Sequence, residues 1–386
     1  MKTLLKLAGS LFIGLIIGMF IAVTIGALIE GESPLQVIKS LFDKESLPKM
    51  ISILWMLLWL LVAYILHIAI HEGGHLVAGL MTGYRFVSYR FMNWTVIRKD
   101  GRLQWRNFEL AGTGGQCLMA PPDKPIEQID TRWYNAGGVL ANILLVVIAA
   151  VLLFALDLPT WANEFLSIMI VIGILVALTN GIPMKLGGVA NDGRNLLQME
   201  KDLPAKQSFC NILEINARSQ EGQTYSEMPE CLFELPQPFD WKNAMHVGSA
   251  LSLATWLMAQ YRWEDAYQLL TEALDNKDDI MALYQLELEN MMTQVCIVMG
   301  RDDEARQHYS KDIAKYVSRH APTQSDKQFT AMAVALALDG DRPRAENIVK
   351  ELEANREKYI HQGDVALSLD LMHWLLDNKR DNYQTT

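Results

Sequence analysis

Residues 50–75 read MISILWMLLWLLVAYILHIAIHEGGH, and this stretch decides the fold of the first half of the chain. It has no charged residue from Met50 to Ile70, and such a run is long enough to cross a bilayer as a helix. It ends in His71-Glu72-Gly73-Gly74-His75. Two histidines four positions apart lie on one face of a helix, so both imidazoles can reach one zinc ion, and the glutamate between them can act on a zinc-bound water. Ionisable groups at membrane depth are costly, and they indicate a functional site.

Charge is unevenly distributed along the 386 residues, a length that allows two or three domains. Residues 1–199 carry 15 Lys and Arg and 13 Asp and Glu, whereas residues 200–386 carry 19 and 31, so the net charges of +2 and −12 sum to −10. The first half has a membrane-like composition and the second that of an acidic soluble domain. Nucleic acid and anionic lipid are therefore not expected as partners of the second half. None of the four cysteines forms a CxxC pair, which argues against a structural zinc knuckle and fits a reducing compartment.

Four uncharged runs have the length of a membrane span: Leu7–Ile29, Met50–Ile70, Asn135–Leu156 and Phe165–Met184. The first is longer than the apolar region of a signal peptide, so residues 1–30 are expected to form an uncleaved anchor. Lys2 and Lys6 precede the first run, and lysine and arginine gather between the second and third runs and after the fourth, whereas residues 30–49 have three lysines with four acids and residues 157–164 have no positive charge. The positive-inside rule therefore predicts a multi-pass protein of the cell membrane with both termini in the cytoplasm.

A catalytic zinc site needs a third protein ligand and leaves one position for water. The segment from Asn180 through Pro183 to Asp192-Gly193 follows the fourth run, and it places Asp192 at the same predicted membrane face as His71 and His75. His67 lies one turn before His71 on the same face, and we expect it to be a packed polar neighbour rather than a fourth ligand.

With these parts the sequence resembles the site-2 protease family of intramembrane zinc metalloproteases over residues 48–200. The resemblance implies that His71, His75 and Asp192 are the zinc ligands and that Glu72 activates the bound water. The family's Gly-Pro-x-x-Asn hairpin is loosely matched by residues 137–142, GGVLAN, where proline is absent. This match implies that Asn142 orients substrate or stabilises an oxyanion. Residues 114–122, GGQCLMAPP, are similar to a stretch in a Gram-positive bacterial branch, which also has the longer loop found here between Pro183 and Asp192.

A β-hairpin is predicted after the zinc-binding motif. Arg85–Ile97 and Arg102–Leu110 are rich in aromatic and β-branched residues, and Asp100-Gly101 is a turn signal between them. The edge of this hairpin either takes an extended substrate by strand addition or only braces the site. Ala111–Pro122 is expected to be a loop at the mouth of the site.

The second half is predicted to consist of an irregular linker with short helices over residues 201–241 and a helical domain over residues 242–386, with the helical pattern reaching about Asn378. Three similar segments contain Ala266, Ala305 and Ala345, which are 39 and 40 residues apart and each follow a turn that opens a helix. This pattern resembles tetratricopeptide-like helical repeats. Such a domain is either a docking surface for a substrate or regulator, or a simple stabilising domain. The five histidines of this half are scattered in the manner of surface residues: His246, His308, His320, His361 and His373.

The expected fold is mainly α: a polytopic membrane bundle of four spans with a small β-hairpin or sheet near the membrane surface, then a soluble helical-repeat domain. The expected function is that of an intramembrane zinc metalloendopeptidase with one Zn²⁺ per chain. It would hydrolyse peptide bonds of a membrane-anchored protein or peptide within or beside the bilayer. The alternative is a noncatalytic peptide-handling membrane protein, such as a transport accessory or receptor, that keeps the protease fold. The expected partners are a peptide or transmembrane protein substrate, membrane lipid, and a regulator that docks on the helical domain.

Overall fold

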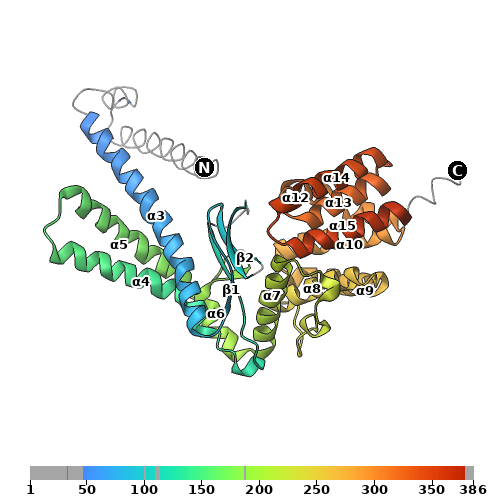
Figure 1. The fold of residues 1–386 in the computed structure, drawn as a ribbon, viewed down its shortest axis with the longest axis horizontal. Helices are drawn as coiled ribbons and strands as arrows, with labels where there is room; N and C mark the ends of the chain where they lie inside the picture. Colours follow the sequence, from blue (N-terminus) through green and yellow to red (C-terminus); the bar gives the residue numbers. More distant parts are fainter. Residues whose placement is uncertain (1–32, 34–46, 100, 109–113, 187, 379–386) are drawn as a thin grey trace.

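The computed structural model describes residues 33, 47–99, 101–108, 114–186 and 188–378 (Figure 1). Most of these residues are helical, and one four-stranded antiparallel sheet lies between the apolar helices and the C-terminal helices. The mainly α prediction is therefore confirmed. The first predicted span, Leu7–Ile29, lies outside the described residues.

Three described helices are long and apolar enough to cross a membrane: α3 (Leu47–Met81), α4 (Arg132–Ala155) and α5 (Thr160–Gly181). They pack on one another, yet many of their large apolar side chains face outward, and Phe154 is 86% exposed. Such a surface is what a lipid environment covers. These helices match the second, third and fourth predicted spans. Because α3 continues past Ile70 to Met81, the His71–His75 motif lies inside a continuous helix.

Helices α3 and α4 cross closely at a pair of glycines. A Cβ atom added to Gly74 would lie 2.1 Å from the carbonyl oxygen of Gly137, and one added to Gly137 would lie 2.4 Å from the carbonyl oxygen of Gly74. Small residues allow backbones to approach in this way. Gly73 has open space around it, so only the second glycine of the motif serves the crossing.

The sheet has the order β3-β2-β1-β4, with β1 (Arg85–Phe91), β2 (Trp94–Lys99), β3 (Arg102–Asn107) and β4 (Gly115–Ala120). The predicted hairpin is right for β2 and β3, which are joined through Gly101 at φ 73°. The prediction of one strand over Arg85–Ile97 is wrong, because the chain turns at Met92, where φ is 52°. The predicted loop Ala111–Pro122 is also wrong in part, because β4 pairs with β1 and forms an edge of the sheet.

Helix α7 (Leu203–Glu221) replaces the first half of the predicted irregular linker. The side chain of Asp202 accepts a hydrogen bond from the backbone N–H of Ala205 at 3.0 Å, and Pro204 occupies the first turn, so the proline begins a helix instead of breaking one. Helix α7 packs on the sheet: Glu214 pairs with Arg85 at 2.9 Å. It thereby joins the two halves of the chain.

The C-terminal helices form a single large core, and they extend to Asn378 as predicted. They are α8 (Ala244–Ala259), α9 (Trp263–Asp275), α10 (Ala282–Val298), α11 (Asp302–His308), α12 (Lys311–His320), α13 (Ser325–Ala337), α14 (Arg342–Asn355) and α15 (Gln362–Asn378).

The three alanines of the predicted repeat occupy equivalent positions. Ala266, Ala305 and Ala345 are each the fourth residue of a helix, and each is 0% exposed. The repeated helix starts are thus confirmed, whereas the tetratricopeptide resemblance remains a prediction. The expectation of surface histidines is wrong for His246, which is buried in α8.

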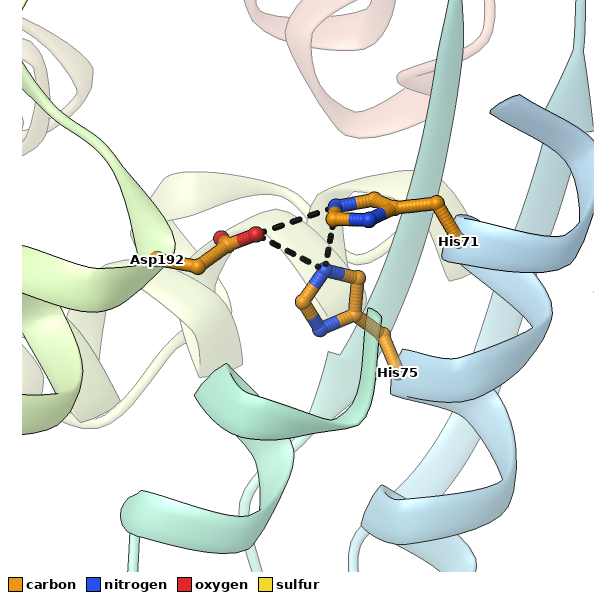
Figure 2. A group of neighbouring side chains, drawn as sticks. All are labelled: His71, His75 and Asp192. Atoms are coloured by element: carbon orange, nitrogen blue, oxygen red, sulfur yellow. Dashed lines mark hydrogen bonds and ion pairs between the residues drawn. The ribbon is translucent and has the colours of Figure 1, made fainter. Parts of the chain in front are cut away.

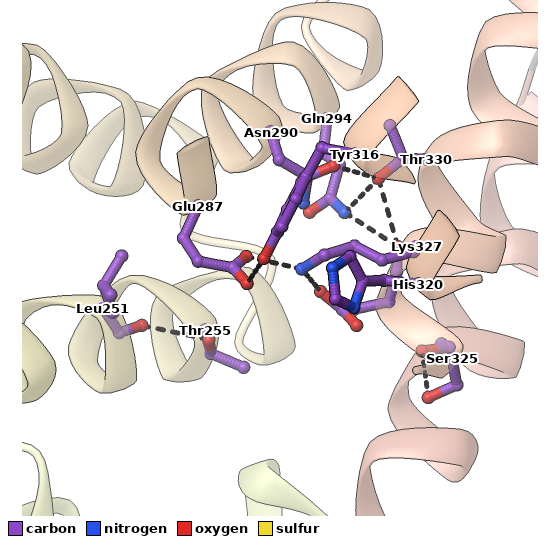
Figure 3. A network of polar contacts seen from close by, with 12 residues as sticks. Leu251, Thr255, Glu287, Asn290, Gln294, Tyr316, His320, Ser325, Lys327 and Thr330 are labelled. Atoms are coloured by element: carbon purple, nitrogen blue, oxygen red, sulfur yellow. Dashed lines mark hydrogen bonds and ion pairs between the residues drawn. The ribbon is translucent and has the colours of Figure 1, made fainter. Parts of the chain in front are cut away.

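A buried ion network lies inside this helical domain (Figure 3). The ammonium group of Lys327 lies 2.5 Å from a carboxylate oxygen of Glu287 and 2.5 Å from one of Asp326, and Tyr316 donates its hydroxyl hydrogen to Glu287. Burial disfavours the charged form of Lys327, but the two carboxylates hold its pKa above the ordinary value. The network lines a cavity of about 330 Å³.

Candidate metal centre

His71 and His75 project from α3 toward Asp192, the first residue of α6 (Asp192–Gln198) (Figure 2). The Nε2 atoms of the two rings are 3.1 Å apart. Oδ2 of Asp192 lies 3.0 Å from Nε2 of His71 and 3.4 Å from Nε2 of His75. The expected convergence of these three side chains, which come from positions 117 residues apart at the closest (192 minus 75), is therefore present.

Asn191 fixes Asp192 in place. As the N-cap of α6, its Oδ1 accepts hydrogen bonds from the backbone N–H groups of Arg194 at 3.1 Å and Met184 at 3.0 Å. Its Nδ2 donates to the carbonyl oxygens of Thr179 at 2.8 Å and Ile182 at 2.6 Å. The loop between α5 and α6 is thus tied to the end of α5. The sequence analysis missed Asn191, although an asparagine before Asp-Gly at a helix start is an N-cap signal.

The three ligand atoms have the spacing of a metal site. Bonds of about 2.0 Å in a tetrahedral zinc site separate the ligand atoms by about 3.3 Å, and the separations here run from 3.0 to 3.4 Å. Oδ2 of Asp192 is buried and forms no hydrogen bond of good geometry, although both rings lie within ion-pair distance. A buried carboxylate oxygen that has no hydrogen bond and faces two imidazole nitrogens fits a cation between the three atoms.

Gly138 of α4 provides the room for such a cation. A Cβ atom at this position would lie 2.6 Å from Nε2 of His71 and 2.6 Å from Nε2 of His75. Any side chain would therefore fill the space in front of the ligand atoms. These observations show that the residues present fit a zinc ion.

Hydrogen bonds and charge prepare two of the ligands. Nδ1 of His75 lies 2.6 Å from the carbonyl oxygen of Tyr134, which can only accept, so Nδ1 carries the hydrogen and Nε2 keeps its lone pair. Burial would raise the pKa of Asp192, but the two imidazoles that face its carboxylate outweigh this effect and lower the pKa to about 2. Asp192 is a carboxylate at neutral pH.

Glu72 lies between the two histidines in sequence and against β4 in space. A Cβ atom at Gly115 would lie 2.6 Å from Cγ of Glu72, so only glycine lets the strand come this close. The backbone N–H of Cys117 lies near the Glu72 carboxylate. Sequence patterns alone did not indicate that a strand positions this side chain.

Asn142 lies directly behind His71 and is 0% exposed. Its amide lies between two rings, with Oδ1 3.0 Å from Nδ1 of His67 and Nδ2 3.0 Å from Nδ1 of His71. The structure thus places Asn142 at the site but gives its amide two partners other than substrate. His67 bonds to Asn142 and to the carbonyl oxygen of Met169 at 2.9 Å, so the expectation of a packed polar neighbour is confirmed.

A second group of potential ligands, Cys296, Glu304 and His308, has its atoms within 4.8 Å of one another. Glu304 accepts a hydrogen bond from the Tyr267 hydroxyl at 2.6 Å, and Nδ1 of His308 lies 2.6 Å from Glu289. These contacts explain the cluster as a hydrogen-bond network between helices. All four cysteines of the chain are unpaired.

Comparison with protein-family models, curated proteins and solved structures finds no match for this chain. A functional assignment therefore rests on the geometry of the site and the chemistry of its residues.

Proposed function

We propose that this chain is a zinc metalloendopeptidase of the site-2 protease type that hydrolyses a peptide bond of a membrane-anchored protein or peptide within or beside the bilayer. One observation carries the proposal: a carboxylate and two imidazoles converge in a space that Gly138 leaves open, at the end of three apolar helices. The presence of Glu72 beside these ligands favours hydrolysis over simple metal storage.

When bound, zinc supplies a water of near-neutral pKa and polarises the scissile carbonyl. His71, His75 and Asp192 would hold the ion. Glu72 accepts a proton from the attacking water as its oxygen bonds to the carbonyl carbon. The same proton then goes to the leaving nitrogen when the C–N bond breaks. The close approach of Gly115 keeps the Glu72 side chain near the ligands.

Strand β4 is the sheet edge beside Glu72, and it supports a mode of substrate binding. A membrane helix must unwind before its peptide bonds become accessible, and an extended segment can then pair with a free edge. The carbonyl oxygen of Cys117 already accepts the Tyr134 hydroxyl at 2.9 Å, and that of Gly115 accepts from the Arg90 guanidinium at 3.4 Å. We infer that an extended substrate segment uses the remaining backbone groups of the β4 edge.

The distribution of lysine and arginine supports a multi-pass protein of the cell membrane with both termini and the metal centre on the cytoplasmic side. Cysteine-accessibility mapping tests this orientation. Labels at positions 30 and 190 should react from opposite sides of the membrane, and reaction from one side would contradict the topology. The helical domain would then be available in the cytoplasm as a docking site for a substrate or regulator.

Cleavage of a membrane-spanning model peptide by the purified full-length protein tests the catalytic role. Glu72→Gln preserves size and should keep the metal, while cleavage should fall by about 100-fold or more because the proton acceptor is lost. Glu221→Gln, at an exposed residue of α7, is the matched control and should cleave as the wild type does. Equal cleavage by Glu72→Gln and wild type would rule out Glu72 as the base. A zinc-loaded wild type that binds the peptide without cleaving it would support the noncatalytic peptide-handling alternative. Glu72→Gln also serves to trap the natural substrate.

A further inference from the structure

His67 lies where the three apolar helices meet. It projects from α3, its Nδ1 faces Asn142 of α4 at 3.0 Å, and its Nε2 faces the carbonyl oxygen of Met169 of α5 at 2.9 Å. His67 and Asn142 are both 0% exposed. Gly173 of α5 makes room for the ring, since a Cβ atom there would lie 2.4 Å from Cε1 of His67. A fully enclosed histidine with fixed partners at both nitrogens has a defined set of hydrogens.

The position of the ring hydrogen of His67 can be assigned from its contact with the Met169 carbonyl. A carbonyl oxygen only accepts, so Nε2 of His67 carries a hydrogen and donates it to Met169. A neutral His67 then has its lone pair on Nδ1 and needs a donor there. The only donor that Asn142 offers is its NH2 group, which must face His67 and leaves the amide oxygen facing His71.

This orientation prepares His71 as a ligand. The amide oxygen of Asn142 accepts a hydrogen from Nδ1 of His71, so the lone pair of His71 is on Nε2, the atom that lies 3.0 Å from Asp192. His75 reaches the same tautomer through the Tyr134 carbonyl. In this arrangement each of the three rings carries one hydrogen, and each ring N–H has an acceptor.

The opposite orientation of the amide has two costs. The structure places Oδ1 beside His67 and Nδ2 beside His71, and these two atoms occupy equivalent positions that a 180° rotation exchanges without other movement. With Oδ1 beside His67, both nitrogens of His67 face acceptors, and the single ring hydrogen of a neutral histidine can satisfy only one of them. With Nδ2 beside His71, the hydrogen of His71 moves to Nε2 and blocks the ligand atom. Metal binding therefore selects the rotated amide.

We propose that Asn142 and His67 are positioning residues that set His71 in its metal-binding tautomer, with the Met169 carbonyl as the anchor of the chain. The inference rests on the proposed function only for the presence of a metal, and it assigns Asn142 a role different from contact with substrate. It also explains why a polar residue lies at position 67 of an otherwise apolar segment.

Metal affinity of the purified full-length protein tests this chain without use of the enzymatic activity. Cobalt(II) binding followed by its visible absorption, in competition with zinc, gives the dissociation constants. His67→Leu and Asn142→Leu should each weaken binding by about 10- to 100-fold, the usual cost of removing a partner behind a ligand. Asn142→Asp keeps an acceptor for His71 and should bind metal within about tenfold of the wild type. Val146→Ala, one turn along α4, is the control for a packing change and should bind as the wild type does.

A spectroscopic signature separates tautomer control from general structural support. Histidine ¹⁵N spectra of the zinc-loaded protein should show His67 with its hydrogen on Nε2 and His71 with its hydrogen on Nδ1. Unchanged metal affinity in His67→Leu, or a hydrogen on Nδ1 of His67 in the loaded protein, would overturn the inference while leaving the metal centre intact. A wild type that binds no metal would overturn the inference and the proposed function together.

Discussion

Among the residues that are not proposed ligands, Gly138 is the one on which the proposed metal centre depends most. Its missing side chain leaves the space in front of both Nε2 atoms open, since a Cβ atom would lie 2.6 Å from each. Gly138→Ala should therefore reduce zinc affinity at least tenfold, because backbone and rings in a close-packed region cannot move aside freely. Zinc content after dialysis against a chelator measures the effect. Gly73→Ala, which meets open space on α3, should keep its zinc, and equal loss in both variants would contradict the argument.

The spacing of residues along the sequence predicted some residues of the candidate site and gave no signal for others. The four-residue interval of His71 and His75 and the membrane-side argument for Asp192 were sufficient to predict that these three side chains converge. The role of Gly138 depends on how α4 crosses α3, and that of Gly115 depends on how β4 passes Glu72. Contacts between segments distant in sequence leave no periodic signal in a single chain. For Asn142, the sequence resemblance indicated the position but not the two rings that its amide contacts.

At the scale of secondary-structure elements, a single side chain holds the loop between α5 and α6. Asn191 makes four hydrogen bonds that join the end of α5 to the start of α6. Asn191→Ala should destabilise the protein by about 1–3 kcal/mol and release zinc, because Asp192 loses its fixed position. Thermal unfolding with and without zinc measures both effects. Asn191→Asp keeps the cap acceptor and should lose less stability. Full retention of zinc and stability in Asn191→Ala would show that α6 is held by other contacts.

Helix α13 carries Lys327, the buried cation of the ion network in the C-terminal domain. Lys327 is 1% exposed, and its removal leaves the carboxylates of Glu287 and Asp326 without their cation. Lys327→Met should lower the free energy of unfolding by about 3 kcal/mol, as expected when one partner of a buried ion pair is lost. Denaturant unfolding measures this change. Lys350→Met on exposed α14 should change the free energy by less than about 0.5 kcal/mol. Equal effects of the two substitutions would contradict a structural role for the network.

The long apolar helices could be predicted from the sequence because a long run of uncharged residues is typical of a membrane-spanning helix. Strand β4 was not, because Gly114 and Gly115 at its start are typical of a loop, and the need for glycine at position 115 comes from Glu72. Helix α7 is longer than the short helices that were predicted for the linker. Both elements connect the membrane half to the C-terminal half, and such contacts are decided by tertiary packing.

At the scale of the whole molecule, we expect the C-terminal half to become less stable in mild acid. His246 is buried in α8, its Nδ1 accepts the backbone N–H of Asp240 at 3.0 Å, and burial lowers its pKa despite the nearby carboxylates of Asp202 and Asp240. The unfolded chain therefore binds a proton more readily than the folded one. The stabilisation is fully present above the unfolded pKa of about 6.5 and is lost as the pH falls below it.

Thermal unfolding of the wild type and of His246→Asn between pH 7.5 and about pH 5.5 isolates this contribution. Asparagine offers an acceptor near the position of Nδ1 but does not titrate. The melting temperature of the wild type should fall more steeply with acidification than that of the variant. Parallel curves would show that His246 does not contribute to the pH dependence.

The chain combines a proposed metal centre at the end of apolar helices with an acidic helical domain. Our main proposal is that the first half binds zinc through His71, His75 and Asp192. Metal analysis of the full-length protein, purified without chelators, tests this claim most directly. The account predicts one zinc ion per chain in the wild type and a loss of most of it in Asp192→Ala, with zinc retained in Glu72→Gln. A wild type without bound zinc, or an Asp192→Ala variant with a full complement of metal, would contradict it.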